Sequence, residues 1–284
     1  MPNDKFLKAC VIGWPIKHSR SPLIHNYWLK KYGILGIYEK VAVPPDELPL
    51  FIKNLSANGF EGCNVTIPHK ESVFVHVEVT DAVTRQIGAV NTVYFEDKKQ
   101  YGLNTDGYGF ISNLKSMVPS WNSEGKTCAI LGAGGASRAI IAILLNEGVK
   151  KIFLVNRTKP RAQNLTREFG DKVIPIGFDE IEIPLSNADL LVNTTSLGMV
   201  GQPSLDISLD FLPPNCVVYD IVYDPLETNL LKQAKDKNLQ TVDGLGMLLH
   251  QAVPGFEKWF GVRPQVTDDL KALLVVDLMK DKEQ

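Results

Sequence analysis

Cysteines are few in this sequence and long apolar runs are missing, which argues against several classes of protein. The four cysteines, Cys10, Cys63, Cys128 and Cys216, lie far apart and form no C-x-x-C pair. Neither a zinc site nor a disulfide framework is therefore expected. The longest strongly apolar stretch, residues 139–145, is far shorter than the roughly 20 residues that span a bilayer. The sequence therefore predicts no membrane segment.

Charge of one sign is not in excess either. Thirty Lys and Arg residues against thirty-two Asp and Glu residues give a net charge of −2, which leaves no basic field to attract nucleic acid or an anionic membrane. The apolar run near the start, residues 9–12, is too short for a secretory signal. Three of the cysteines fall in strand-like apolar runs, as free thiols do in reducing compartments. We therefore expect a cytoplasmic protein without nucleic-acid or membrane partners.

Histidines are also few. The five histidines are scattered without the spacing of metal ligands. We therefore expect them to serve as surface or capping groups, and we expect no metal.

The length and the order of apolar runs predict an α/β protein of two domains. A chain of 284 residues exceeds the usual size of one domain. Short β-branched runs alternate with amphipathic runs over residues 8–76 and again over 127–221, and such alternation is typical of parallel sheets covered by helices. Residues 91–95 and 100–103 suit a hairpin, a linker is expected near 106–125, and the last runs, 247–260 and 267–279, are expected to be helices.

A glycine-rich turn marks the second domain as a dinucleotide-binding domain. Residues 126–131 form a strand-like run that leads directly into Gly132-Ala133-Gly134-Gly135-Ala136-Ser137, and a strongly apolar helix pattern follows. Small residues let the backbone approach a pyrophosphate and direct helix N–H groups at it. Ser137 replaces the third Gly or Ala of the pattern but is still compact. A glycine turn without a ligand is the alternative, and the strand–turn–helix context favours a nucleotide site.

The end of the next strand indicates which cofactor binds. NAD enzymes place an acidic residue there for the ribose 2′-hydroxyl, whereas this chain has Asn156, Arg157 and Thr158, with Arg161 one turn later. Thr158 suits an N-cap, so both arginines lie near the positive end of a helix, where a bound 2′-phosphate would offset their charge. The sequence therefore predicts NADP, with two solvated surface arginines as the alternative.

Polar residues gather where strands of the first domain end. Ser21 suits an N-cap followed by a proline, and Ser19 lies beside it, where a carboxylate would be favoured. Asn64 and Thr66 share one side of a strand end, and Lys70 falls in the first helical turn that follows, where the helix dipole makes an ammonium easier to deprotonate. Capping and surface exposure would also explain these residues singly. Together, the many uncharged donors suit a small polyhydroxylated acid.

The ordered set of these motifs resembles the shikimate dehydrogenase family over essentially the whole chain. It comprises the runs at 19–22, 64–70, 88–92, 104–107, 156–158, 195–199, 219–228 and 243–251 together with the glycine turn. The resemblance implies NADP-dependent, reversible conversion of 3-dehydroshikimate to shikimate, in the chorismate route to aromatic amino acids.

The resemblance also implies residue roles. Lys70 would transfer the proton and would be paired with Asp106. The substrate would be held by Ser19, Ser21, Asn64, Thr66, Asn91, Tyr223 and Gln251. The cofactor would be held by Gly132, Ala133, Gly134, Gly135, Ala136, Asn156, Arg157, Thr158, Arg161, Thr194, Ser196, Met199, Ile221, Gly244 and Met247.

On this basis, residues 1–106, completed by C-terminal helices over 247–284, are expected to form the substrate-binding and catalytic domain. Residues 107–246 are expected to form the NADP-binding Rossmann domain, with a cleft between the two. A monomer or homodimer is expected. Two alternatives stay open at this point: a quinate/shikimate dehydrogenase that uses NAD, and a non-catalytic NADP-binding sensor with the same fold.

Overall fold

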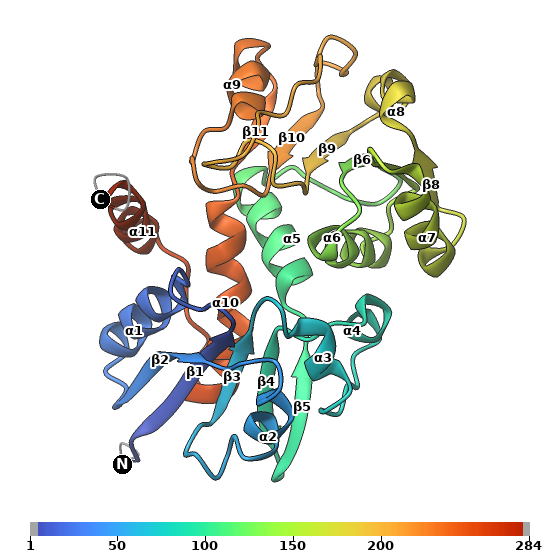
Figure 1. Ribbon diagram of the computed structural model, residues 1–284. Coiled ribbons are helices and arrows are strands. Elements are labelled where there is room, and N and C mark those ends of the chain that lie inside the picture. The colour runs from blue at the N-terminus through green and yellow to red at the C-terminus, as the bar shows by residue number, and fades with distance from the viewer. Residues whose placement is uncertain (1–4, 281–284) are drawn as a thin grey trace. The chain divides into compact units, whose positions relative to one another are not determined.

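The computed structural model describes residues 5–280 and divides into two compact units (Figure 1). Unit 1 consists of the chain up to Thr105 together with the chain from Leu249 onward. Unit 2 consists of Asp106–Leu248. Unit 1 is therefore built from both ends of the sequence, and unit 2 is one continuous segment.

Unit 1 contains a five-stranded mixed sheet in the order β2-β1-β3-β4-β5. The strands β1, β2 and β3 run parallel, and β4 and β5 form the predicted hairpin, paired antiparallel with each other and with β3. The strands are β1 (Leu7–Gly13), β2 (Gly36–Ala42), β3 (Gly62–Val65), β4 (Thr92–Glu96) and β5 (Lys99–Leu103). The helices are α1 (Ser21–Lys31), α2 (Leu48–Lys53), α3 (Lys70–Phe74), α4 (Ala82–Ile87) and α11 (Asp268–Lys280), and α10 (Leu245–Phe260) enters the unit from Leu249.

The C-terminal helices complete an aromatic core in unit 1. Trp28 of α1 packs edge-on against Phe256 of α10, with ring centroids 5.3 Å apart. The indole N–H of Trp259 donates to the carbonyl oxygen of Val93 over 2.9 Å, which joins α10 to β4. Because these aromatic side chains come from both ends of the chain, unit 1 needs its last residues to bury its core.

Unit 2 contains a six-stranded parallel sheet in the order β11-β10-β9-β6-β7-β8, so the α/β prediction is confirmed. The strands β6, β7 and β9 are almost wholly buried because parallel strands have helices over both faces. The strands are β6 (Thr127–Leu131), β7 (Lys151–Val155), β8 (Val173–Ile176), β9 (Leu190–Asn193), β10 (Val217–Asp220) and β11 (Gln240–Val242). The helices are α5 (Asp106–Met117), α6 (Gly135–Asn146), α7 (Lys159–Phe169), a 3₁₀ turn (Phe178–Glu180), α8 (Glu182–Ser186) and α9 (Asn229–Asp236).

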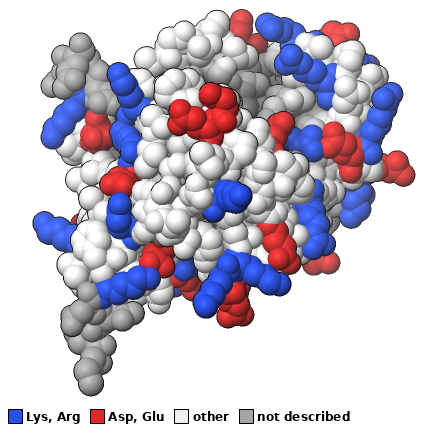
Figure 2. All heavy atoms as spheres, turned by 60° about the horizontal axis from the view of Figure 1, so that its bottom comes forward, with Lys and Arg blue, Asp and Glu red and all other residues white. Residues whose placement is uncertain are grey.

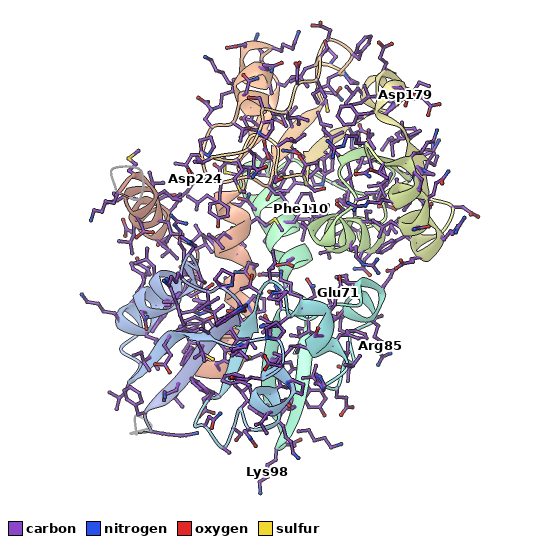
Figure 3. The ribbon with its side chains drawn as sticks, in the orientation of Figure 1. Glu71, Arg85, Lys98, Phe110, Asp179 and Asp224 are labelled. Carbon is purple, nitrogen blue, oxygen red and sulfur yellow. The ribbon has the colours of Figure 1, made fainter. Side chains whose placement is uncertain are left out.

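The prediction of a linker over residues 106–125 is wrong for most of its length. Residues 106–117 form α5, which belongs to unit 2 and buries Phe110 and Leu114. Phe110, labelled in Figure 3, stacks on Tyr219 of β10 with ring centroids 4.6 Å apart. The helical spacing of apolar residues over 106–117 determined the local structure, and the turn residues that follow did not extend the linker back into it.

The surface carries mixed charge. Figure 2 shows acidic and basic side chains interspersed on the face that it presents, as the near-equal totals of 30 and 32 would suggest. Among residues 5–280, no helix is both long enough and apolar enough to cross a membrane. In the same part of the chain, no group of three or more His, Cys, Asp or Glu side chains could hold a metal ion.

Candidate functional site

The glycine turn of unit 2 leaves open space over the start of α6. Gly134 has an ordinary extended backbone, with φ −108°, and a Cβ atom on it would meet no atom within 4 Å. A Cβ atom on Gly135 would also meet nothing within 4 Å. Neither backbone conformation nor protein packing therefore requires glycine at these two positions. Room for a group outside the chain does explain them, and a pyrophosphate at a helix N-terminus fits that room.

Other contacts hold the same turn in shape. Gly132 has φ +106°, and a Cβ atom there would lie 2.9 Å from the Thr194 hydroxyl oxygen, so this position does require glycine. The Ser137 hydroxyl donates to the Gly132 carbonyl oxygen over 2.7 Å and accepts from the Gly134 N–H over 3.1 Å. Thr194 Oγ1 donates to the Leu131 carbonyl oxygen over 2.7 Å. Ser137, the departure from the glycine pattern, thus stabilises the turn.

Two exposed arginines follow β7, and the one basic residue between them, Lys159, pairs with Glu180. Arg157, Thr158 and Arg161 are exposed, and Thr158 occupies the predicted N-cap position of α7, although its side chain makes no capping hydrogen bond. Asn156 Nδ2 donates to the Thr158 carbonyl oxygen over 2.9 Å, which shapes the turn. The first turn of α7 contains no acidic residue. The donors and charges of this turn therefore fit an additional phosphate group.

The remaining predicted cofactor residues follow β9 and β10 or begin α10. Thr194, Ile221 and Met247 are half-buried, Gly244 is buried, and Ser196 and Met199 are exposed. Asn113 of α5 holds the turn before α10, because its Nδ2 donates to the Asp243 carbonyl oxygen and to the Tyr219 hydroxyl, each over 2.8 Å.

A buried carboxylate fixes the segment after β10. Asp220 Oδ1 accepts from Asn193 Nδ2 over 2.9 Å and from the Val222 N–H over 3.0 Å, and Oδ2 accepts from the Thr228 hydroxyl over 2.7 Å. Burial raises the pKa of Asp220, and these three hydrogen bonds act in the opposite direction. Asp220 therefore links the segment that carries Ile221 and the half-buried Tyr223 to Asn193 of β9 and to Thr228.

In unit 1, the predicted serines lie at the start of α1. Ser19 is half-buried and Ser21 is buried. Ser21 was expected to be the N-cap, and that expectation is wrong: Arg20 holds the N-cap position, and Ser21 and Pro22 are the first helical residues. The Arg20 side chain pairs with Asp277 of α11, with Nε and Oδ2 3.1 Å apart.

A hydrogen-bond network connects three of the predicted substrate residues. Asn64 Nδ2 donates to the Asn91 carbonyl oxygen and to Thr92 Oγ1, each over 3.1 Å. Asn91 Oδ1 in turn accepts from the Thr105 N–H over 2.9 Å. The Thr105 hydroxyl donates to the Gln251 carbonyl oxygen over 2.8 Å. The structure therefore brings Asn64, Asn91 and the backbone of Gln251 together within unit 1.

Lys70 and Thr66 belong to the same region of unit 1. Lys70 is the first residue of α3, as predicted, and is half-buried, as is Thr66. The next residue along α3, Glu71, is labelled in Figure 3. The Lys70 carbonyl oxygen accepts from the Val90 N–H over 2.8 Å, which ties the start of α3 to the residue before Asn91. Asp106 opens α5 and, like Tyr223, belongs to unit 2.

Two histidines are not the surface or capping groups that the sequence analysis expected. His25 is fully buried between aromatic rings, and His69 is 1% exposed. His69 Nε2 donates to the Val43 carbonyl oxygen over 2.8 Å, next to Lys70. Burial lowers the pKa of His25 to about 3, so its ring is neutral near pH 7. Aromatic rings enclose His25 and a backbone acceptor pairs with His69, and neither environment is visible in local sequence.

Sequence reasoning also missed Tyr38, which looks like an ordinary strand aromatic. Thr92 and Thr105 stood beside predicted residues but were not selected. Motif spacing would have found the two threonines, whereas Tyr38 could be found only from the pairing of β1 with β2 and β3.

A parallel sheet with a glycine turn at a helix start, joined in one chain to a second α/β unit with a polar network, defines a dinucleotide-binding oxidoreductase of two units. Three family models match. The shikimate dehydrogenase substrate binding domain covers residues 11–93, shikimate / quinate 5-dehydrogenase covers 114–200, and the shikimate 5′-dehydrogenase C-terminal domain covers 244–274. The chain belongs to the shikimate dehydrogenase family.

Individual relatives agree with this. The chain is 51% identical over 271 residues to shikimate dehydrogenase (NADP(+)) of Azorhizobium caulinodans. The match covers 95% of this chain and 96% of that protein. The crystal structure of shikimate 5-dehydrogenase from Thermus thermophilus with NADP(H) and shikimate matches at 34% identity with a TM-score of 0.83, over 95% of this chain and 99% of the other. Quinate dehydrogenase from Corynebacterium glutamicum with NAD matches at 28% identity with a TM-score of 0.87, over 95% and 99%.

Proposed function

We propose that this protein is an NADP-dependent shikimate dehydrogenase, which converts 3-dehydroshikimate to shikimate reversibly within aromatic amino-acid biosynthesis. The observation that carries the proposal is the relationship of nearly the whole chain to shikimate dehydrogenase (NADP(+)). The open space over Gly134 and Gly135 and the first turn of α7, which contains no acidic residue of its own, support the cofactor assignment independently.

We assign the two units different tasks. Unit 2 would hold NADP through its glycine turn and the residues that follow β7, β9 and β10. When bound, NADP supplies hydride chemistry at its nicotinamide ring. Arg157 and Arg161 would face the 2′-phosphate, and the N–H groups at the start of α6 would face the pyrophosphate.

Unit 1 would hold the substrate. Ser19 and Ser21, helped by Tyr223 of unit 2, would bind the carboxylate, and Asn64, Thr66, Asn91 and Gln251 would bind ring hydroxyls. Lys70 would protonate or stabilise the oxygen on which negative charge develops, and Asp106 would orient that ammonium. A substrate with several hydroxyls needs many partners once water is excluded, and the amide and hydroxyl groups of this network meet that need.

The proposal extends to the protein's surroundings. Four free, buried cysteines are typical of a reducing compartment such as the cytoplasm. The nearly balanced charge of −2 favours a small-molecule enzyme over a nucleic-acid or membrane-surface binder. A monomer or homodimer remains our prediction for the assembly.

The direct test is to mix purified protein with shikimate and NADP and to follow the absorbance of reduced nicotinamide. We expect turnover with this pair to exceed turnover with quinate and NAD. Faster reaction with quinate and NAD would favour a quinate dehydrogenase. Binding of NADPH without turnover of either substrate would favour a non-catalytic sensor and would reject the proposed activity.

A further inference from the structure

Tyr38 is a buried polar residue to which the proposed function gives no task. It lies in β2 with 1% of its side chain exposed, and its hydroxyl donates to Asn64 Oδ1 over 2.6 Å. Burial raises the pKa of Tyr38 well above its usual value, the thiols of Cys10 and Cys63 add to this, and a hydrogen bond with Ser21 opposes it. The hydroxyl therefore keeps its proton and remains a donor to Asn64.

The Asn91 carbonyl oxygen and the Tyr38 hydroxyl together favour one of two orientations of the Asn64 amide. In the observed orientation, Oδ1 faces the Tyr38 hydroxyl and Nδ2 faces two acceptors, the Asn91 carbonyl oxygen and Thr92 Oγ1. A flipped amide would set Oδ1 against the Asn91 carbonyl oxygen, so that two acceptors would face each other, and the Tyr38 hydroxyl would have to accept from Nδ2 instead of donating to Oδ1. Both N–H groups of Asn64 are thus used inside the protein, so only its oxygen can receive a further group, and that group must be a donor.

Packing fixes the Tyr38 ring from several sides. His25 stacks on it with ring centroids 4.0 Å apart and planes inclined by 12°, and Trp259 lies 5.8 Å away. The Tyr38 N–H also donates to Asn26 Oδ1 over 2.9 Å, which anchors the strand to α1. The position of the hydroxyl is therefore set by α1, β2 and α10 together.

We propose that Tyr38 is a positioning residue for the substrate site: its hydroxyl holds the Asn64 amide so that Oδ1 accepts a hydrogen bond from a ring hydroxyl of the substrate. The inference rests on the proposed function and deepens it, because it assigns Asn64 the role of acceptor and gives the reason for its orientation. Tyr38 itself does not touch the substrate. Its loss should therefore weaken substrate binding and leave cofactor binding intact.

The test is Tyr38→Phe, which removes only the hydroxyl, with Tyr219→Phe as a matched control. Tyr219 is also fully buried, and its hydroxyl also contacts one asparagine, Asn113, but in unit 2. We expect Tyr38→Phe to raise the KM for shikimate roughly 5- to 10-fold, the scale of one neutral hydrogen bond, with kcat and the KM for NADP changed far less. Tyr219→Phe should leave the KM for shikimate unchanged.

A double-mutant cycle with Asn64→Ala separates positioning from general damage. If Tyr38 acts through Asn64, adding Tyr38→Phe to Asn64→Ala should raise the KM for shikimate no further. An unchanged KM in Tyr38→Phe, additive effects in the cycle, or an equal rise in Tyr219→Phe would overturn the inference. Wild-type enzyme without turnover would instead reject the proposed function on which the inference rests.

A second variant covers the case in which Tyr38→Phe does not fold. Thr92→Val has nearly the same shape and removes the Oγ1 that accepts from Asn64 Nδ2, together with the hydrogen bond that this hydroxyl donates to Asn91 Oδ1. It should also raise the KM for shikimate several-fold, because the amide then loses one of the bonds that set its orientation. A Thr92→Val enzyme with the wild-type KM would contradict the proposed orientation.

Discussion

Lys70 stands at the start of α3, half-buried, with its backbone tied to Val90. If its ammonium protonates or stabilises the developing oxyanion, Lys70→Ala should lower kcat by about 10²- to 10⁴-fold and raise the KM for shikimate much less. Steady-state kinetics measure both constants. Lys53→Ala, an exposed lysine at the end of α2, serves as the control and should change neither. A Lys70→Ala enzyme with normal kcat would remove Lys70 from the mechanism.

His25 makes stability depend on pH. Burial lowers its pKa in the folded protein to about 3, whereas an unfolded histidine has a pKa of about 6.5. Between these values the unfolded chain binds one more proton than the folded chain, so the free energy of unfolding decreases as pH falls. The titration of His25 should lower the free energy of unfolding by about 2 kcal/mol between pH 7 and pH 5.

Urea denaturation at both pH values measures this effect. His25→Phe keeps an aromatic ring without a titrating group and should reduce the loss between pH 7 and pH 5. His76→Gln, at an exposed position, should leave the loss unchanged. An identical pH dependence in His25→Phe and the wild-type protein would contradict the assignment to His25.

Residues at strand ends could be selected from sequence because motif order places them there. Asn64, Asn91 and Lys70 were identified in this way, and the structure places the first two in one network. Tyr38 and His25 could not be identified, since most of their contacts join residues 12 or more positions apart through the fold. The roles of all these residues in catalysis and binding remain predictions.

The turn between β6 and α6 contains glycines of two kinds. Gly134→Ala adds a methyl group to open space, so it should change the free energy of unfolding by less than about 1 kcal/mol. The same methyl group would occupy the room assigned to the pyrophosphate, so the Kd for NADPH should rise roughly tenfold or more. Fluorescence titration with NADPH and urea denaturation measure the two quantities.

Gly132→Ala is the contrasting variant. Its positive φ of +106° and the Thr194 hydroxyl 2.9 Å from the added carbon should make it less stable by about 2 kcal/mol or more. If Gly134→Ala bound NADPH as tightly as the wild type, the pyrophosphate would not lie over this residue.

The start of α7 carries the predicted preference for NADP. Replacing Arg157 and Arg161 by Ala should weaken NADPH binding by about one to two decades per arginine and narrow the difference from NADH. Arg167 is an exposed arginine in the last turn of the same helix, and Arg167→Ala should change neither the affinity for NADPH nor its difference from the affinity for NADH. Kd values for both reduced cofactors provide the measurement. Unchanged NADPH affinity in the double variant would reject the phosphate assignment.

Elements with a clear apolar period were predicted well, and short or polar ones were not. The hairpin β4–β5, the strand β6 and the helices α10 and α11 fell where the pattern placed them. The helix α9 and the short strand β11 were missed, because α9 is mostly polar and β11 has only 3 residues. The N-cap of α1 was misplaced by one residue, since Arg20 holds that position with helical backbone angles and Ser21 already belongs to the helix.

At the scale of the whole molecule, the last helix completes unit 1. Leu274 of α11 is fully buried, and the Trp28 indole N–H donates to the Gln265 carbonyl oxygen just before this helix over 3.0 Å. Leu274→Ala should therefore lower the free energy of unfolding by about 2–5 kcal/mol, whereas Leu273→Ala, at a 36% exposed position, should cost less than about 1 kcal/mol.

NADPH binding at low temperature should be unaffected in both variants, because the predicted cofactor residues belong to unit 2. Thermal unfolding and NADPH titration together check this expectation. A matched loss of NADPH affinity in Leu274→Ala would contradict the division of tasks between the units.

The layout of unit 1 also bears on how the protein is made. Its first 105 residues leave the ribosome early, yet the partners for their aromatic core are translated only after residue 248. The continuous segment 106–248 can finish folding on the nascent chain. The strands that precede it keep apolar surface exposed until the C-terminal helices are translated. We therefore expect chaperones to bind the N-terminal third during synthesis and to release it once the final helices emerge.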